Sequence, residues 1–226
     1  MFPSHTRSSM VGSVEVEKTI ALLVQDLSPL RRRAVGRRLL AGAGVGLVVA
    51  HLLVALVLGY RADLLAASGG AMFWIKLAYG TSIGLLALWT GERLARPGTR
   101  VRARAVWLVG PFAGIAALAL WRLGQAPESG WPTLLMGSSA SVCSWLIVCM
   151  AAPCLAGLLW GLRGLAPTRL VLTGAMAGLA AGGLGAGAYA LHCGETSGPF
   201  VAIWYSLGVA AASALGAAVG PIVLRW

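Results

Sequence analysis

The sequence predicts an all-α membrane protein, with a bundle of six transmembrane helices behind a short amino-terminal arm. Of its 226 residues, 58% are hydrophobic and only 11% are charged, and the mean hydropathy is +0.80. Globular domains are about half apolar and a quarter charged, so this composition excludes an ordinary soluble domain. Since the apolar segments show no alternation at period two, we expect helices rather than a closed β-barrel to cross the lipid.

Six apolar segments approach the ~20 residues that a helix needs to cross ~30 Å of hydrocarbon. They cover residues 39–59, 72–90, 105–121, 137–160, 168–191 and 200–223. The third is the shortest, and the fifth and sixth are rich in Gly and Ala, which let helix backbones approach closely in lipid. The chain therefore divides into an arm, residues 1–38, and a transmembrane domain, residues 39–226.

Basic residues predict the orientation of these helices. If the amino terminus is cytoplasmic, one side of the membrane carries most of the arginines: Arg7, Arg31, Arg32, Arg33, Arg37, Arg38, Arg93, Arg96, Arg100, Arg102, Arg104, Arg163, Arg169 and Arg225. The opposite side keeps Arg61 and Arg122, so the positive-inside rule places both termini in the cytoplasm. Lys76 lies near the outer end of the second helix, and we expect its side chain to reach the outer interface.

This topology also explains the net charge of +11. The basic residues fall in the loops between apolar runs, so the charge indicates contact with the lipid bilayer and not direct binding of nucleic acid. The first residues lack the basic and apolar regions of a cleaved secretory signal, and we expect a mature amino terminus.

The arm contains one amphipathic pattern, which predicts a helix over about residues 14–27. Its apolar residues recur at spacings of four, three and four: Val16, Ile20, Leu23 and Leu27. Pro29 ends the helix, and the basic residues of 31–38 anchor the chain at the anionic inner leaflet. The helix is mildly acidic, which favours binding in a groove of a partner protein over lying on lipid. The alternative is that it packs under the bundle.

The segment "YALHCGETSGPF", residues 189–200, is the one place where a histidine, a thiol and a carboxylate gather. His192, Cys193 and Glu195 fall in the outer loop between the fifth and sixth helices. Cys143 lies at the same depth in the fourth helix, since that helix also begins on the outer side. Cys149 and Cys154 lie deeper and should behave as small buried apolar residues.

Two chemical interpretations of this cluster stay open. Cys143, Cys193 and His192, with Glu195 as a further ligand, would suit a soft metal such as zinc or a heavy metal, bound transiently. The same two thiols would form a disulfide if their Cα atoms come within about 7 Å. The structural alternative is that His192 and Glu195 merely cap and solvate helix ends beside a buried cysteine.

Other functions find less support in the sequence. A haem attachment motif is absent, and His51 lies too deep in the first helix to pair with His192 as a ligand. We expect His51 to be a neutral imidazole bonded within the bundle. No paired carboxylates occur in the membrane segments, so we predict neither an enzyme nor a required cofactor.

These features resemble the NrsF-type membrane anti-sigma factors, negative regulators of sigma factor F in bacteria. The resemblance extends over nearly the whole chain: the arm with "LLVQDLSPLRR", the fourth helix with "SSASVCSWLIVCMAAPCLAGLLWGLRGLAPTR", and the segment "YALHCGETSGPFVAIWYSLG". It implies a multi-pass protein of the bacterial inner membrane. It further implies that the arm holds an extracytoplasmic-function sigma factor in the cytoplasm.

Carried to this sequence, the resemblance implies that Cys143 and Cys193 are the outer pair that responds to oxidants or heavy metals. The partner-binding residues would be Ile20, Leu23, Leu27 and Pro29. The extra thiols of Cys149 and Cys154 depart from the family pattern and leave other pairings open. Two alternatives are a small membrane transporter or metal exporter with an outer thiol site, and a membrane thiol oxidoreductase.

Overall fold

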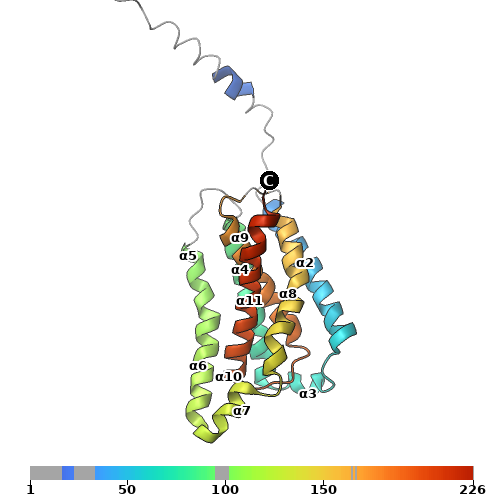
Figure 1. Cartoon of the computed structure of the whole chain (residues 1–226), viewed down its shortest axis with the longest axis vertical. Helices are drawn as coiled ribbons and strands as arrows, with labels where there is room; N and C mark the ends of the chain where they lie inside the picture. The colour runs from blue at the N-terminus through green and yellow to red at the C-terminus, as the bar shows by residue number, and fades with distance from the viewer. Residues whose placement is uncertain (1–16, 23–33, 95–101, 164, 166, 226) are drawn as a thin grey trace, which may run out of the picture. The chain divides into compact units, whose positions relative to one another are not determined.

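The computed structural model describes residues 17–22, 34–94, 102–163, 165 and 167–225 (Figure 1). The chain separates into two units, Met1–Ala34 and Val35–Trp226. In the first unit residues 17–22 are helical, with Ile20 and Leu22 exposed. The rest of the predicted amphipathic helix lies outside the described residues, as do Leu23, Leu27 and Pro29. The helix therefore stays a prediction beyond these six residues.

The second unit confirms the predicted all-α class, because its described residues contain helices and no strand. Six of its helices are long and apolar enough to cross a membrane. The main helices are α2 (Ala34–Leu53), α4 (Ala71–Leu94), α6 (Val109–Gln125), α8 (Ala140–Leu162), α9 (Leu170–Tyr189) and α11 (Ser206–Val223). Short helices connect them: α3 (Leu64–Ser68), α5 (Arg102–Ala105), α7 (Trp131–Met136) and α10 (Gly198–Phe200). Each predicted segment corresponds to one span, with ends that differ by a few residues.

Two spans contain a π-helical turn, at Val54–Leu58 after α2 and at Val201–Tyr205 before α11. Such a turn widens the helix and frees a backbone carbonyl, so it is common at functional positions. The carbonyl of Trp204 accepts a hydrogen bond from the Ser144 hydroxyl at 2.8 Å. The second turn therefore fixes the start of α11 against α8.

Helix α9 lies at the centre of the bundle and packs against α4, α8 and α11. Its glycines make this possible, because a Cβ on Gly178 would lie 2.3 Å from the Ala212 carbonyl oxygen of α11. On another face, a Cβ on Gly183 would lie 2.4 Å from the Gly84 nitrogen of α4. Backbone thus meets backbone on two sides of α9, as small residues allow in lipid.

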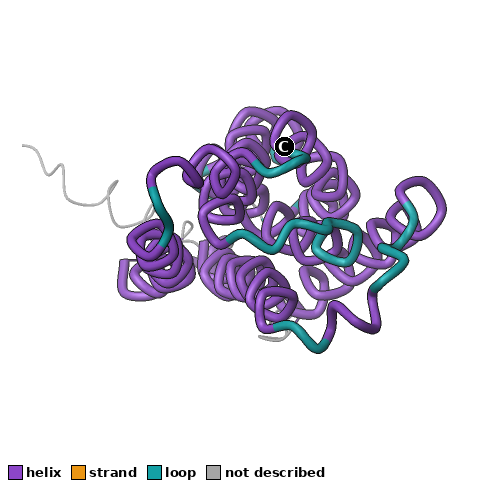
Figure 2. Tube along the Cα trace, turned by 90° about the horizontal axis from the view of Figure 1, so that it is seen from below, coloured by secondary structure: helices purple, strands orange, loops and turns teal. Residues whose placement is uncertain are grey.

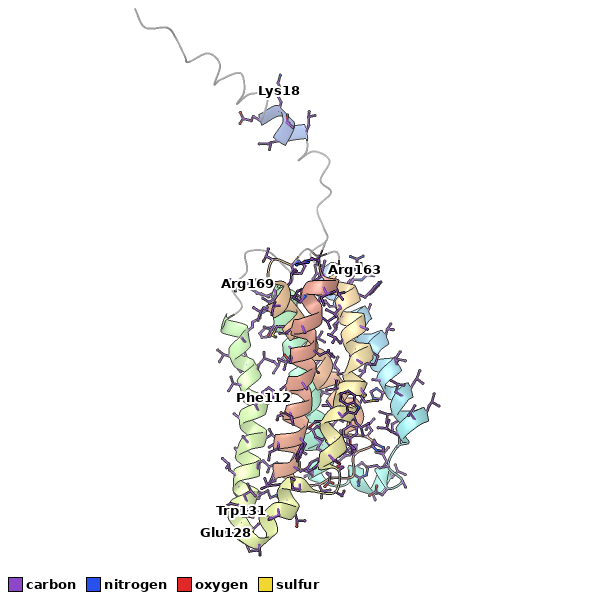
Figure 3. All side chains as sticks on the ribbon, in the orientation of Figure 1. Lys18, Phe112, Glu128, Trp131, Arg163 and Arg169 are labelled. Carbon is purple, nitrogen blue, oxygen red and sulfur yellow. The ribbon has the colours of Figure 1, made fainter. Side chains whose placement is uncertain are left out.

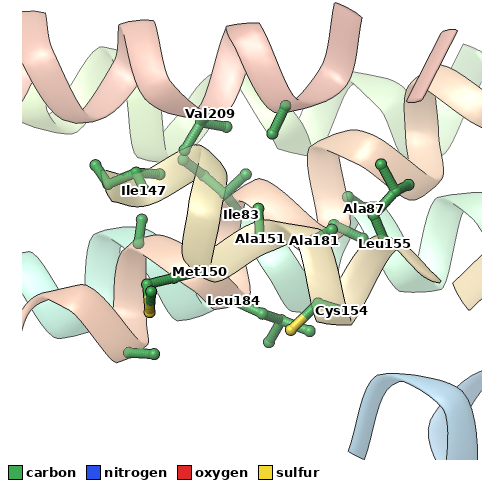
Figure 4. Packing of buried hydrophobic residues seen from close by; sticks show 14 of the residues in the cluster. Ile83, Ala87, Ile147, Met150, Ala151, Cys154, Leu155, Ala181, Leu184 and Val209 are labelled. Carbon is green, nitrogen blue, oxygen red and sulfur yellow. The ribbon is translucent and has the colours of Figure 1, made fainter. Parts of the chain in front are cut away.

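Larger side chains fill the interior of the bundle away from these glycine contacts. Ile83 of α4, Ile147 of α8 and Val209 of α11 are fully buried, and they meet around Ala181 and Leu184 of α9 (Figure 4). Without a hydrophobic drive in lipid, this close packing is the main source of helix association.

The two ends of the bundle differ in charge. One end, here called the arginine end, carries the described arginines Arg37, Arg38, Arg93, Arg104, Arg163, Arg169 and Arg225. The other, here called the cysteine end, is formed by residues 59–70, 126–139 and 190–197, whose loops cross the helices in the axial view (Figure 2). Arg163 and Arg169 mark the first end and Glu128 and Trp131 the second (Figure 3). This separation matches the charge pattern expected from the sequence.

Candidate sensor site

Cys143 and Cys193 meet at the cysteine end of the bundle. Cys143 lies in the first turn of α8, where its N–H donates to the Ser139 carbonyl at 2.9 Å. Cys193 follows the last turn of α9, and its N–H donates to the Tyr189 carbonyl at 3.0 Å. The side chains of both cysteines are buried, with exposed fractions of 0% and 3%. Both cysteines therefore lie inside the protein at the same end of the bundle.

The two sulfur atoms face each other. The Cys143 and Cys193 side chains interact with each other, and both cysteines are free thiols. The Tyr189 hydroxyl also contacts both sulfurs. The Tyr205 hydroxyl is fully buried beside Cys193, but forms no hydrogen bond of good geometry with the residues described. The two thiols thus lie together, next to the side chains of Tyr189 and Tyr205.

The surroundings of Cys193 favour its ionised form. The contact with the Cys143 thiol and the nearby Lys76 ammonium lower the pKa of Cys193, although burial acts in the opposite direction. The thiolate is the form of cysteine that attacks oxidants and binds metals. The surroundings of Cys193 therefore favour the reactive form of its thiol, once a reagent reaches it.

Lys76 corrects one expectation from the sequence. Its side chain does not extend to the outer interface, because the loop after α9 folds over it and its exposed fraction is 0%. Its Nζ donates to the Cys193 carbonyl at 2.8 Å and to the Glu195 carbonyl at 2.6 Å. The physical reason is that a loop with free carbonyls offers a buried ammonium the acceptors that it would otherwise seek in water.

The Glu195 carboxylate lies at the amino end of α8. Its Oε1 accepts hydrogen bonds from the Ser138 N–H at 2.7 Å, the Ser138 hydroxyl at 2.6 Å and the Ser139 hydroxyl at 3.3 Å. Burial acts to raise the pKa of Glu195, but these hydrogen bonds outweigh it and hold the pKa below its usual range. A charged carboxylate at the start of a helix is favoured by the helix dipole.

His192 lies on the other side of the loop. Its Nδ1–H donates to the Gly59 carbonyl at 2.7 Å, and its ring packs against that of Tyr189. Nearby, Arg61 is held by Asp63 through two hydrogen bonds of 2.7 Å and contacts the Cys193 carbonyl at 3.5 Å. The loop that begins at Gly59 thus covers the loop that carries Cys193.

The structure brings together the two thiols, but not a complete set of metal ligands. Among the residues that it describes, no three side chains of His, Cys, Asp or Glu are grouped so as to hold a metal ion. His192 and Glu195 are each engaged with other partners, as described above. These bonds occupy Nδ1 of His192 and Oε1 of Glu195 and leave Nε2 and Oε2, so their role as ligands stays a hypothesis.

The remaining candidates lie deeper in the bundle. Cys154 is fully buried against α2, where a Cβ on Gly46 would lie 2.5 Å from its Cα, and Cys149 is half-buried. His51 donates from Nδ1 to the Leu47 carbonyl of its own helix at 2.9 Å. None of these residues joins the pair at the cysteine end.

Comparison with known proteins decides the family. The sequence profile described as "Negative regulator of sigma F" matches residues 23–226. The chain belongs to the NrsF family. It is 39% identical to the anti-sigma-F factor NrsF of Caulobacter vibrioides and 33% identical to the probable anti-sigma-F factor NrsF of Azospira oryzae. Both comparisons cover 94% of this chain and 100% of the relative. No solved structure matches the chain.

The residues matched by the family profile, 23–226, include Cys143 and Cys193 of the site and, in the arm, Leu23 and Leu27 of the apolar stripe. Sequence reasoning missed the roles of Lys76, Tyr189 and Tyr205 beside the pair. Lys76 carried the one signal that would have found it, since a charged residue within a membrane span is a functional candidate by default. The tyrosines carried no such signal, because aromatic residues are common near helix ends.

Proposed function

We propose that this NrsF-family chain is a bacterial inner-membrane anti-sigma factor, which holds an extracytoplasmic-function sigma factor through its arm. It releases that partner when Cys143 and Cys193 react with an oxidant or a heavy metal. The observation that carries the sensing part is the contact of two free thiols from separate spans at the cysteine end. The names of the two relatives support the partner part.

The charge difference between the ends supports the orientation. A surplus of arginine marks the cytoplasmic side of a membrane protein, so the arginine end faces the cytoplasm. The cysteine end then faces an oxidising compartment, where disulfides form and persist. Both termini lie in the cytoplasm, where a sigma factor is found.

The chemistry at the pair is a two-electron oxidation. The two thiols lose two electrons and two protons to an external oxidant, and a sulfur–sulfur bond forms between Cys193 and Cys143. The lowered pKa of Cys193 provides the attacking thiolate. A heavy metal would instead be held by Cys143 and Cys193, whose thiols would lose their protons on binding it. Either event changes how α8 packs against the end of α9.

Release needs only a modest coupling between the two ends. A coupling of about 1–3 kcal/mol changes the affinity for a partner about 5- to 150-fold. This is sufficient for a sigma factor present near its dissociation constant. Helix α9 is the candidate for carrying the change, because its glycine contacts with α4 and α11 present few large side chains that would resist sliding.

The arm is tested by capture of the partner from solubilised membranes, followed by identification of the retained proteins. Ile20 is 54% exposed on the predicted apolar stripe, whereas Leu22 is 68% exposed on the opposite face of the same helix. We expect Ile20→Asp to lose the sigma factor and the matched control Leu22→Asp to keep it. Equal capture by both variants and the unchanged chain would overturn the binding role of the stripe.

The same preparation separates the rival functions. A metal exporter keeps metal movement into vesicles when residues 1–30 are deleted, and a thiol oxidoreductase turns over a dithiol substrate. A regulator does neither, and its Cys143→Ser and Cys193→Ser variants still hold the partner but no longer release it under oxidant. Loss of partner binding in the serine variants without any stress would show instead that the thiols are structural.

A further inference from the structure

We propose that Lys76 and Glu195 are positioning residues, which clamp the Cys193 loop between α4 and α8 and transmit the state of the cysteine pair to both helices. The inference rests on the proposed function, and it names the side chains through which the pair acts. It depends on three observations: a buried ammonium, a carboxylate bound to the two serines before another helix, and a glycine that leaves room for that carboxylate.

The buried ammonium is the first observation. Lys76 is the one charged side chain that is buried among the residues described. Burial of an unpaired ammonium costs several kcal/mol, and an apolar side chain of similar size would fill the same space without that cost. Its two short hydrogen bonds, to the carbonyls of Cys193 and Glu195, are what offset this cost. They attach α4 to both sides of a three-residue stretch of loop.

The carboxylate at the start of α8 is the second observation. The helix has Ser139 at its N-cap, but that side chain forms no capping bond to the helix backbone. Glu195 binds the two residues just before the helix, by accepting the N–H of Ser138 and the hydroxyls of Ser138 and Ser139. The first turn of α8, which contains Cys143, is thereby attached to the loop that contains Cys193.

Gly137, the third observation, leaves the space that the Glu195 carboxylate occupies. It has a φ of +53°, and a Cβ at this position would lie 2.7 Å from the Glu195 Oε2. A side chain here would be strained by its backbone and would collide with the carboxylate. The glycine and the glutamate lie 58 residues apart in the sequence, so their fit is independent of local turn geometry.

The clamp explains how chemistry at two sulfurs reaches two helices. Residues 193–195 are held by α4 through carbonyls and by α8 through a carboxylate. When a bond or a metal draws the sulfurs together, the loop must move relative to at least one of these helices. Both helices run on to the arginine end, at Leu94 and Leu162. A change at the pair therefore reaches α4 and α8 through the clamp, in addition to α9, whose last turn Cys193 follows.

The test measures release per cross-linked molecule. Membranes hold the full chain with Cys149→Ser and Cys154→Ser, and diamide is used to oxidise the pair by taking up its two electrons and two protons. Cross-linked and reduced molecules are separated by gel shift, and the apparent affinity of each for the sigma factor is measured. The compared variants are Lys76→Met and Glu195→Ala, with Lys76→Arg and Glu195→Gln as conservative partners.

We expect cross-linking to lower the affinity of the otherwise unchanged chain at least 5-fold. In Lys76→Met and Glu195→Ala the cross-linked and reduced forms should differ by less than about 2-fold, a difference too small for useful coupling. The conservative variants keep a donor or an acceptor at the same place and should recover most of the response. A merely structural role would not be rescued in this pattern.

Failure of this inference and of the proposed function are distinguishable. If the unchanged chain forms the cross-link and keeps its partner, the proposed function is wrong. If it releases the partner and the two variants release it equally well, only the clamp is wrong.

Should Lys76→Met not accumulate, the double variant Ser138→Ala with Ser139→Ala weakens the same clamp from the α8 side. The exposed Ser141→Ala on the same helix is its control, and an unchanged response of the double variant would again overturn the inference.

Discussion

The contact between α4 and α9 predicts the effect of one methyl group. In Gly183→Ala the new Cβ would lie 2.4 Å from the Gly84 nitrogen and 2.7 Å from the Gly80 carbonyl oxygen, whereas ordinary contacts begin at 3.4 Å. Both neighbours are backbone atoms that cannot rotate away. The two helices must therefore separate by about 1 Å at this point, and overpacking of this kind costs about 1–3 kcal/mol.

The assay is unfolding of the purified protein in mixed micelles, followed by circular dichroism. Gly114→Ala in α6 is the matched control, because nothing lies within 4 Å of its added Cβ. We expect the control to stay within about 0.5 kcal/mol of the unchanged protein. If Gly183→Ala unfolds at the same denaturant concentration as Gly114→Ala, the close approach of α4 and α9 is refuted.

Three further predictions concern the ends and the middle of the bundle. Gly137→Ala should destabilise the protein by about 1–3 kcal/mol, because it strains the backbone and displaces the Glu195 carboxylate from Ser138 and Ser139; thermal unfolding that matches the unchanged protein would contradict this. The 2.6 Å hydrogen bond between Tyr79 and Ser206 joins α4 to α11, and a double-mutant cycle with Tyr79→Phe and Ser206→Ala should give a coupling of about 0.6 kcal/mol. A coupling of zero would mean that the bond is absent in the membrane. In a background with all four cysteines replaced by serine, a membrane-impermeant maleimide added to spheroplasts should label Glu128→Cys but not Arg163→Cys, and the reverse labelling would invert the proposed orientation.

The number of helices in the bundle and their approximate ends can be predicted from patterns in the sequence. Composition and segment length predict six helices, because each span must satisfy its own backbone in lipid. The depth of Cys143 and Cys193 follows from counting residues along two helices that end on the same side. Helix rise and topology therefore predict that the two thiols share a depth. Whether they are also lateral neighbours depends on how the fourth and fifth helices pack, which the sequence does not give.

The contacts of the side chains around Cys143 and Cys193 cannot be predicted from the sequence in the same way. Whether Lys76 reaches water or a carbonyl depends on where an eight-residue loop folds, and no periodicity describes such a loop. For Glu195 the sequence leaves two roles open, metal ligation beside a thiol and an imidazole, or solvation of a helix end. The structure shows its Oε1 bound to Ser138 and Ser139, just before α8, and residue types alone do not predict these partners.

The two π-helical turns likewise cannot be predicted from the sequence. An extra residue in one turn leaves the hydrophobic pattern of a span almost unchanged, because all its faces are apolar. The turn at Val201–Tyr205 nevertheless lies where Tyr205 packs beside Cys193. Local backbone geometry of this kind follows from packing against neighbouring helices, and so it appears only when they are placed.

The most direct test of the account follows a partly oxidised population of the unchanged chain. After brief treatment with diamide, the sigma factor is used to capture the molecules that still hold it. Disulfides in the captured and uncaptured fractions are then mapped by mass spectrometry. The account predicts that a Cys143–Cys193 disulfide is at least 5-fold enriched among the molecules that have lost the partner. An equal share of that disulfide in both fractions, or a dominant bond to Cys149 or Cys154, would contradict it.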